Sequence, residues 1–408
     1  MRRATILLAA IFTAAPSGPF GAWPMGSEPV VRVGIEVSVP STTLSSAAGL
    51  VMTDLLTGAE IGRVPAGESL VLAARVDRIV ATSPAALRFP PTLRRVQVES
   101  AESGRPLQIG ETSYRGSAEV VVHSASTVTA INRLPLEDYL RGVVPIEIGT
   151  RTPEEFAAVQ AQTVAARTYA LAHLGAREEL GFDLFGSVQD QAYGGWSAER
   201  EDGNRAVETT RGEVLVYERR PIRAFYHSTC GGRTAPVEEV MDRPGAPYLI
   251  SVSDTAPDGS DYCAISPRYR WEAEWTRSEL NQRVRPQLAA YFGMETSEMP
   301  EIDRLEVRSR TRSGRVQALA FVGPGLDAEL TRLDIRLALR DAADRILNST
   351  DFEVADGDDP ERIRLHGRGY GHGAGMCQFG ALGRARAGQG YSEILGAYYV
   401  GAELVRAY

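Results

Sequence analysis

Lysine is absent from this chain of 408 residues, so all 44 of its basic residues are arginine. Without lysine the chain cannot contain a P-loop lysine, the strand lysine of a protein kinase, a Schiff-base lysine or a Ser-x-x-Lys nucleophile. Histidine is scarce too, and the five histidines are never four residues apart, which excludes the HExxH helix of zinc peptidases. A G-x-S-x-G elbow is also missing. These absences remove several common classes of kinase and hydrolase.

The charge of the chain limits its partners. Acidic residues outnumber basic ones by 52 to 44, which gives a net charge of −8. An acidic chain is a poor match for a polyanion, so we expect no nucleic-acid partner. Hydrophobic residues make up 43% of the chain and charged residues 24%, as in ordinary globular proteins. The length predicts about two to three domains.

The N-terminus has the pattern of a secretory signal. Arg2 and Arg3 precede an apolar run from Ala4 to Ala15, and small residues then break the run. We therefore predict a signal peptide at 1–25 and export to the periplasm or cell wall. A buried helix or an uncleaved anchor is the alternative. The run is too short to span a bilayer comfortably, and we expect no membrane span after signal cleavage.

Cysteine is rare, with Cys230, Cys263 and Cys377 as its only positions. Three is an odd number for a chain exported to an oxidising compartment. At most one intramolecular disulfide can form, and the sequence does not select the pair.

The predicted elements give a mixed α+β fold, with β-rich segments around a central Ala-rich helix and a Gly-rich C-terminal loop. We divide the mature chain into an N-terminal β-rich region at 28–130 and a second region at 131–408. In the first region we expect strands at Val30–Val39, Ser69–Val76, Arg94–Glu99 and Ala118–Val122, with turns at Gly110–Gly116 and near Asn132.

The central helix is predicted to begin at Thr152-Pro153-Glu154-Glu155, a capping box with proline at the first helical position. Its Ala-rich sequence favours helix and allows close packing. Gln160 and Arg167 share one side, which we interpret as a cleft wall; alternatively, Arg167 neutralises a local carboxylate. Further predicted elements are helices at Ser278–Tyr291 and Tyr391–Tyr399 and a hairpin at Ile302–Val322 that turns at Ser313-Gly314.

Three stretches carry chemistry. Glu147 stands among Val143, Val144, Ile146 and Ile148, and a carboxyl in apolar surroundings is a good general acid. An exposed loop glutamate or a structural ion pair is the alternative interpretation.

The second stretch, Ala224–Thr234, brings His227, Ser228 and Cys230 to a Gly-Gly turn. A nucleophile with its base, half of a metal site, and a plain strand end all fit this pattern. The third stretch, Gly367–Ala381, alternates glycines around His372, and such a backbone can approach a ligand closely.

Together these motifs resemble the stage II sporulation protein D (SpoIID) family, which is related to the LytB amidase enhancers. The resemblance extends over residues 30–408. The matching segments are Leu134–Glu147 (Leu-Pro-Leu-Glu-x-Tyr-Leu-x-Gly-Val-Val-Pro-x-Glu), Ala161–Ala170 (Gln-x-Val-Ala-Ala-Arg-Thr-Tyr-Ala) and Gly369–Ala381 (Gly-His-Gly-x-Gly-Met-x-Gln-aromatic-Gly-Ala).

The resemblance implies a peptidoglycan lytic transglycosylase. Such an enzyme cleaves the β-1,4 bond between N-acetylmuramic acid (MurNAc) and N-acetylglucosamine (GlcNAc), preferably in strands without stem peptides, and leaves 1,6-anhydroMurNAc ends. Glu147 matches the family's single catalytic glutamate, and residues 131–408 would be the catalytic region. The implied partners are glycan strands and other cell-wall hydrolases. The alternative is a non-catalytic glycan-binding or amidase-activating protein.

The resemblance also implies substrate-binding positions, which are Gln162, Arg167, Tyr169, Tyr226, His227, Ser228, His372 and Gln378. It implies no cofactor. Some family members bind zinc in a Cys/His-rich stretch, but the corresponding Phe182–Gln191 has neither residue type, so we predict no metal site. A set of His227, Cys230, His372 and Cys377 remains the alternative.

Overall fold

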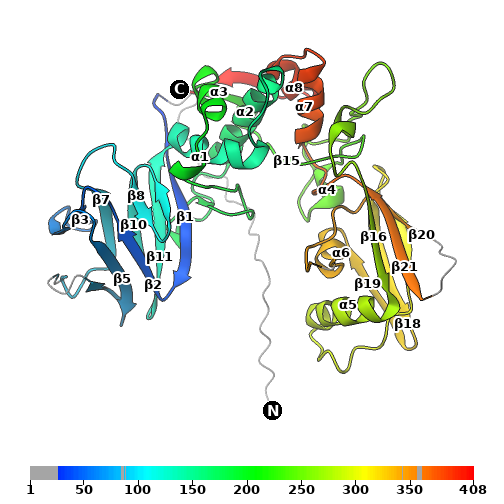
Figure 1. Ribbon diagram of the computed structural model, residues 1–408, viewed down its shortest axis with the longest axis horizontal. Helices are drawn as coiled ribbons and strands as arrows, with labels where there is room; N and C mark the ends of the chain where they lie inside the picture. Colours follow the sequence, from blue (N-terminus) through cyan, green and yellow to red (C-terminus); the bar gives the residue numbers. More distant parts are fainter. Residues whose placement is uncertain (1–25, 84–86, 88, 342, 356–360) are drawn as a thin grey trace. The chain divides into compact units, whose positions relative to one another are not determined.

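The computed structural model describes residues 26–83, 87, 89–341, 343–355 and 361–408 (Figure 1). The predicted signal peptide at 1–25 lies outside the described residues. The described residues form two compact units: unit 1 holds those up to Leu136, at 173–191 and at 407–408, and unit 2 holds those at 137–172 and 192–406. Both strands and helices are abundant, which confirms the mixed α+β fold. Among the described residues, no helix has the length and apolar character needed to cross a membrane.

Unit 1 consists of two sheets that pack on each other through β11, β2 and β5. The larger sheet has the order β12-β1-β11-β10-β7-β3-β4 and the smaller one β6-β5-β2-β8-β9. Alternate residues such as Val31 and Val33 of β1 are buried, as expected for strands with one face on a core. The four predicted strands are confirmed. The strand bounds are β1 (Val30–Val39), β2 (Ser41–Ser45), β3 (Leu50–Asp54), β4 (Glu60–Val64), β5 (Ser69–Arg75), β6 (Arg78–Ser83), β7 (Arg95–Ser100), β8 (Leu107–Ile109), β9 (Thr112–Tyr114), β10 (Ser117–Ser124), β11 (Thr127–Pro135) and β12 (Leu184–Phe185).

Asn132 lies within β11, so the turn predicted near it is wrong. The β10–β11 hairpin turns between Ser124 and Thr127 instead. The buried Asn132 amide donates to the carbonyl oxygens of Arg115 at 2.8 Å and Ser117 at 3.0 Å. Because its polar group is satisfied inside the sheet, the usual preference of asparagine for turns does not apply here.

Residues 173–191 add the short strand β12 to unit 1, in parallel with β1. Asp183 accepts a hydrogen bond from the Arg32 guanidinium at 2.8 Å, and Asp190 accepts one from Arg177 at 3.0 Å. Arginine therefore engages both carboxylates of the stretch Phe182–Gln191.

The first part of unit 2 is built around α2, which contacts α3, α7, α8 and β13. Its many alanines allow these neighbours to approach closely. At its start, the Thr152 N–H donates to Glu155 Oε2 at 3.2 Å, in agreement with the predicted capping box. The elements of this part are α1 (Leu136–Ile148), α2 (Phe156–Ala172), α3 (Glu201–Thr209), β13 (Glu213–Tyr217), β14 (Arg220–Pro221), β15 (Tyr226–His227), β22 (Met376–Cys377), α7 (Gln378–Arg386), α8 (Tyr391–Tyr398) and β23 (Glu403–Arg406).

Helix α1 is not among the elements that the sequence predicts. Pro145 argues against a helix here because it lacks an N–H and crowds the preceding turn. The helix forms because Leu140, Val143 and Val144 share one face and are fully buried, while two acidic residues favour its first turn.

A buried ion pair joins α1 to α2. Arg167 and Glu137 are 0% and 2% exposed, and two guanidinium nitrogens donate to the two carboxylate oxygens at 3.0 and 2.7 Å. Arg167 also donates to the Thr210 hydroxyl at 3.2 Å and to the carbonyl oxygen of Glu213 at 3.1 Å. These contacts favour the interpretation in which Arg167 neutralises a local carboxylate, because its side chain does not reach solvent.

The second part of unit 2 has two three-stranded sheets, β16-β21-β20 and β17-β18-β19, which share a core with α5 (Figure 1). Trp275, Leu288, Phe321 and Leu365 are among its buried residues. The predicted helices at 278–291 and 391–399 and the predicted hairpin are confirmed. The bounds are α4 (Val237–Val240), β16 (Arg270–Thr276), α5 (Arg277–Phe292), β17 (Arg304–Arg310), β18 (Val316–Gly323), β19 (Leu326–Thr331), α6 (Leu333–Ala338), β20 (Phe352–Ala355) and β21 (Arg362–Arg368).

We predict that Arg167→Met destabilises the chain by about 3–5 kcal/mol, because it leaves the Glu137 carboxylate buried without its partner. Urea unfolding followed by far-UV circular dichroism measures this loss. The matched control is Arg63→Met, which breaks an exposed ion pair with Glu60 and should leave the unfolding midpoint unchanged. Equal stability of the two variants would show that the buried pair contributes little.

Candidate active site

Glu147 lies in the last turn of α1, where its half-buried carboxyl meets groups from distant parts of unit 2. Its Oε1 accepts the N–H of Ala192 at 2.8 Å, and the side chains of Tyr226 and Gln378 also hydrogen-bond to it. Ile146, its neighbour in sequence, is 50% exposed. Residues from elsewhere in the chain therefore cover the carboxyl. Ile146 does not, because successive residues of a helix do not share a face.

The environment of Glu147 favours its protonated form. Burial raises the pKa of this carboxyl above the ordinary value for glutamate, and the hydrogen bonds from Ala192, Tyr226 and Gln378 lower it in part. Desolvation has the larger effect because it penalises the charged form. A carboxyl whose pKa is raised in this way is protonated to a greater extent at a given pH, so it can donate a proton and, once ionised, can accept one.

Gly142 allows the segment that contains Ala192 to lie close to α1. The N–H of Gly194 donates to the carbonyl oxygen of Gly142 at 3.0 Å, which holds the segment after Ala192 against α1. A Cβ on Gly142 would lie 2.6 Å from the ring of Tyr193. A larger residue at this position would therefore push the segment away from the helix.

The parallel pairing of β15 with β22 delivers two further partners of Glu147. Tyr226 lies in β15, and Gln378 is the first residue after β22. The Gln378 amide donates to the carbonyl oxygen of Glu147 at 3.0 Å and to Gln162 Oε1 at 3.3 Å. Glu147, Gln162, Ala192, Tyr226 and Gln378 are called the Glu147 cluster below.

His372 supports this cluster indirectly. Its Nε2–H donates to the carbonyl oxygen of Tyr226 at 2.9 Å, and its Nδ1 accepts the N–H of Ala374 at 3.1 Å. Burial lowers the pKa of His372 to about 3, so the ring is neutral. Because both nitrogens bond within the protein, we interpret His372 as a positioning residue for Tyr226.

His227 is buried beside His372, with ring centroids 5.4 Å apart, and its Nδ1 lies 3.2 Å from the carbonyl oxygen of Ala374. Burial lowers its pKa well below the ordinary value for histidine. Among the described residues, the potential metal ligands that gather around Cys230 and Cys377 include neither histidine.

The Gly-rich loop packs against protein groups. A Cβ at Gly373, where φ is +95°, would lie 2.6 Å from the guanidinium carbon of Arg315, and one at Gly375 would collide with the carbonyl oxygen of Phe225. Arg315 is buried, and it donates to the carbonyl oxygen of Cys230 at 3.1 Å. Glycine is thus required at these positions by close internal packing.

The remaining predicted site residues have other contacts. The buried Tyr169 packs edge-on against Phe225, with ring centroids 5.9 Å apart. The Ser228 hydroxyl lies 3.3 Å from that of Thr229. Arg167 is engaged by its buried ion pair. The structure therefore brings Gln162, Tyr226 and Gln378 together near Glu147. The other contacts described in this paragraph hold Arg167, Tyr169 and Ser228 elsewhere.

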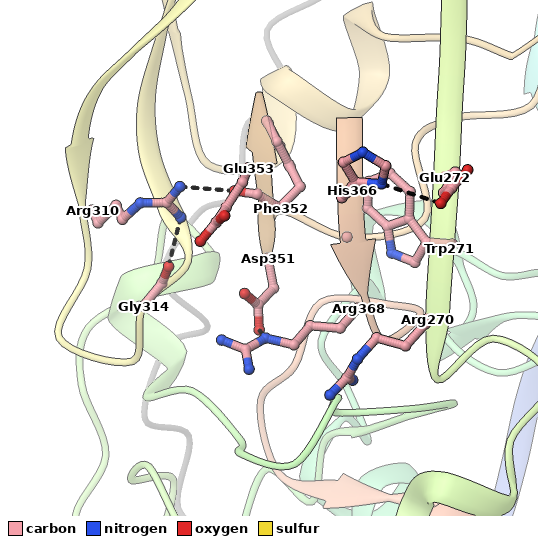
Figure 2. Close-up of a pocket in the computed structure, with 11 residues that line it drawn as sticks. Arg270, Trp271, Glu272, Arg310, Gly314, Asp351, Phe352, Glu353, His366 and Arg368 are labelled. Atoms are coloured by element: carbon pink, nitrogen blue, oxygen red, sulfur yellow. Dashed lines mark hydrogen bonds and ion pairs between the residues drawn. The ribbon is translucent and has the colours of Figure 1, made fainter. Parts of the chain in front are cut away.

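A cavity of about 730 Å³ opens beside β16, β20 and β21, and none of the Glu147 cluster lines it (Figure 2). Several of its charged groups are already paired: Arg368 donates to Asp351 at 3.0 Å, and His366 lies 3.2 Å from Glu272. We therefore keep the Glu147 cluster as the candidate active site. Sequence reasoning missed two contributors to this site: the Ala192 amide, which belongs to the cluster, and Gly142, which lies beside it.

We predict that Gly142→Ala displaces the segment at Ala192 and removes its N–H from Glu147. Overpacking of this kind costs about 1–3 kcal/mol, more than the helix propensity gained from alanine. Hydrogen exchange of the peptide that contains Ala192 should become faster, and the thermal midpoint should fall.

The matched control is Gly396→Ala, at an exposed glycine in the middle of α8 where a Cβ meets no atom within 4 Å. This variant should be as stable as the wild type or slightly more stable. Unchanged exchange at Ala192 in Gly142→Ala would contradict the role assigned to Gly142.

Two family profiles match the chain. Residues 124–217, which include Glu147, match the family described as stage II sporulation protein (SpoIID). Residues 254–375 match a domain of unknown function, DUF8618.

Several known proteins are similar over most of this chain. An uncharacterised protein of Brachyspira hyodysenteriae is 32% identical over 298 residues, covering 72% of each chain. The stage II sporulation protein D of Bacillus subtilis is 28% identical over 329 residues, covering 76% of this chain and 85% of its own. The amidase enhancer of Bacillus subtilis is 30% identical over 300 residues, which are 65% of this chain and 40% of the enhancer. The chain therefore belongs to the SpoIID/LytB family.

Proposed function

We propose that the chain is an exported peptidoglycan lytic transglycosylase whose catalytic region is residues 131–408. Its substrate is the β-1,4 bond between MurNAc and GlcNAc in glycan strands without stem peptides, and its product carries a 1,6-anhydroMurNAc end. The observation that carries the proposal is the half-buried Glu147, whose pKa is raised by burial and whose carboxyl is held by Ala192, Tyr226 and Gln378. Relatives named stage II sporulation protein D and amidase enhancer support a role at the cell wall.

The mechanism uses one carboxyl in two successive roles. Glu147 donates its proton to the glycosidic oxygen while the bond from C1 of MurNAc to this oxygen breaks, and the bonding electron pair leaves with the oxygen. The C6 hydroxyl of the same sugar attacks C1, and the Glu147 carboxylate takes the hydroxyl proton. Ordinary glycosidases need a second carboxylate, as nucleophile or base. Here the intramolecular hydroxyl is already in position, so one carboxyl is sufficient.

The partners of Glu147 fit both roles. Burial favours the protonated carboxyl that the first step requires, and the hydrogen bonds from Ala192, Tyr226 and Gln378 stabilise the carboxylate between the steps. They also fix the direction in which the carboxyl points, which keeps the donated proton aligned with the scissile bond. Gln162 would act through Gln378, since its Oε1 accepts from the Gln378 amide.

The second candidate function is a non-catalytic glycan-binding protein that activates a cell-wall amidase. The amidase-enhancer relative favours it. The two functions differ in one product, because only a transglycosylase creates anhydro ends.

We expect Glu147→Gln to lower glycan cleavage at least about a hundredfold, because the amide has no transferable proton. Mass spectrometry of purified glycan strands would count the anhydroMurNAc ends after digestion. Glu154→Gln, the same change at an exposed position near the start of α2, should cleave like the wild type.

Sedimentation with insoluble glycan would show whether Glu147→Gln still binds. If wild type and variant both bind and neither makes anhydro ends, the chain is a binding protein and the proposed mechanism is wrong.

The raised pKa of Glu147 predicts how stability depends on pH. A carboxyl whose pKa is higher in the folded chain stabilises folding below its unfolded pKa, about 4.3, and this contribution is lost as pH rises through the folded pKa. Glutamine does not titrate. The thermal midpoint of Glu147→Gln minus that of the wild type should therefore increase between about pH 4 and pH 8. A constant or decreasing difference would show that the carboxyl is not desolvated.

A further inference from the structure

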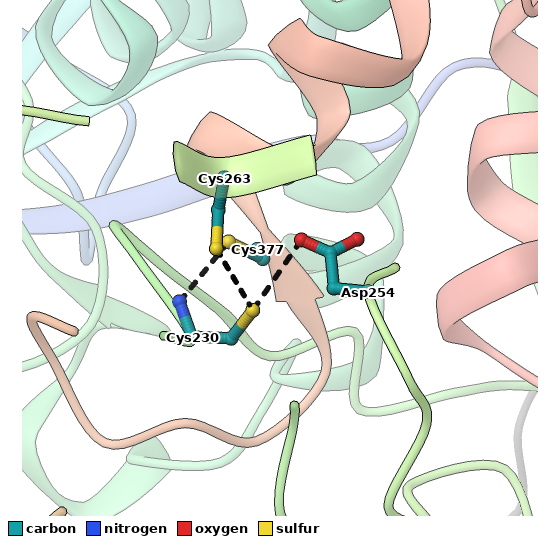
Figure 3. A group of neighbouring side chains, drawn as sticks. All are labelled: Cys230, Asp254, Cys263 and Cys377. Atoms are coloured by element: carbon teal, nitrogen blue, oxygen red, sulfur yellow. Dashed lines mark hydrogen bonds between the residues drawn. The ribbon is translucent and has the colours of Figure 1, made fainter. Parts of the chain in front are cut away.

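The three cysteines come together with Asp254 in unit 2 (Figure 3). All four side chains are buried, and their sulfur and carboxylate oxygen atoms lie within 4.8 Å of one another. Cys230 Sγ lies 3.5 Å from Cys263 Sγ and 3.4 Å from Asp254 Oδ2. These residues, 230, 254, 263 and 377, are called the thiol cluster below. Their spacing in sequence follows no common metal-binding motif.

The distances from Cys230 Sγ to Cys263 Sγ and to Asp254 Oδ2 suit a single tetrahedral ion. Zinc binds thiolate sulfur at about 2.3 Å and carboxylate oxygen at about 2.0–2.2 Å, so its ligand atoms lie about 3.4–3.8 Å apart in a tetrahedron. A disulfide would join only two of the three sulfurs, at about 2.05 Å, and would leave a buried thiol beside a carboxylate.

Backbone amides are directed at the sulfur atoms. Cys377 Sγ accepts the N–H of Cys230 at 3.1 Å and that of Gly380 at 3.2 Å. The N–H groups of Gly231 and Gly232 hydrogen-bond to Cys263. Such donors stabilise negative charge on sulfur, and the thiolate is the form that binds metals.

Asp254 is oriented by a second layer of contacts. Its Oδ1 accepts the Tyr398 hydroxyl at 2.6 Å and the Arg384 Nε–H at 3.3 Å. The other oxygen, Oδ2, faces Cys230. A Cβ at Gly380 would collide with Oδ2 and with the Tyr398 hydroxyl, which explains the glycine at this position of the Gly369–Ala381 motif. Outer contacts of this kind typically orient metal ligands.

We propose that Cys230, Cys263, Cys377 and Asp254 bind one zinc ion. Thiolate ligands select zinc over magnesium and calcium, which prefer oxygen. Four protein ligands leave no open position, so the site is structural. On binding, any of these four groups that is still protonated loses its proton to solvent, so the ligands are three thiolates and one carboxylate. This assignment replaces the expectation from sequence that the chain has no metal site.

The site would hold together the segments that carry the partners of Glu147. Cys377 directly precedes Gln378, and Cys230 follows Tyr226 by four residues. Zinc would therefore fix β15 and β22 at their C-terminal ends. The inference does not depend on the proposed function, because metal content and stability are measured without a glycan substrate.

The first test uses the wild-type full chain purified without chelators. Elemental analysis should find one zinc per chain, and a mercurial reagent should release it as three thiols react. Replacing zinc with cobalt should produce the sulfur-to-cobalt charge-transfer absorption and the intense visible bands of a tetrahedral thiolate site. These measurements do not require any variant to fold.

Variants then identify the ligands. Cys263→Ser and Asp254→Asn should lose zinc or hold it more weakly, and Tyr398→Phe should lower zinc affinity about 10- to 100-fold. Asp258→Asn, the same carboxylate-to-amide change at an exposed position, should keep one zinc per chain, as should Glu147→Gln. A folded wild-type chain without metal, or one with a disulfide among the three cysteines, would overturn the proposal.

Discussion

The candidate site depends on one short interaction, the parallel pairing of β15 with β22. These two-residue strands come from parts of the chain that lie far apart in sequence, yet Tyr226 on one and Gln378 just after the other must reach the same carboxyl. Two residue pairs are a small interface, and such a pairing cannot be stable alone. The structure strengthens it from both sides: His372 bonds to the carbonyl oxygen of Tyr226, and the Cys230 amide bonds to the sulfur of Cys377.

Sequence reasoning predicted the elements that local patterns encode. In β2 and β5, buried residues alternate with more exposed ones, so strands of this kind are found from neighbouring residues. Helix α1 was missed because Pro145 lies in its last turn. The apolar neighbours of Glu147 marked it as a candidate acid. The resemblance to a known family supplied its role and added Tyr226 and Gln378, which no local pattern would have connected to it. The structure gave Arg167 and His372 contacts within the protein, since a motif does not show which way a side chain points.

Other parts of the site could not have been predicted from sequence. The partner from Ala192 is a backbone N–H, and a backbone group has no sequence signal beyond the fold that places it. The thiol cluster joins residues 230, 254, 263 and 377, and only the tertiary structure makes them neighbours. The glycines of the C-terminal loop are ambiguous for a similar reason. A sequence does not show whether a glycine leaves room for a ligand or for another side chain of the protein. Here Gly373 leaves room for the Arg315 side chain.

Arg315 has a consequence for how this architecture can evolve. It lies in the 254–375 region, yet it bonds to the carbonyl oxygen of Cys230, which precedes that region in the chain. Asp254 and Cys263 come from the same region. A region that lies only on the surface of a protein can be lost or exchanged between relatives. This region supplies buried contacts to Cys230, four residues after Tyr226, so we expect it to be inherited and to change together with that segment.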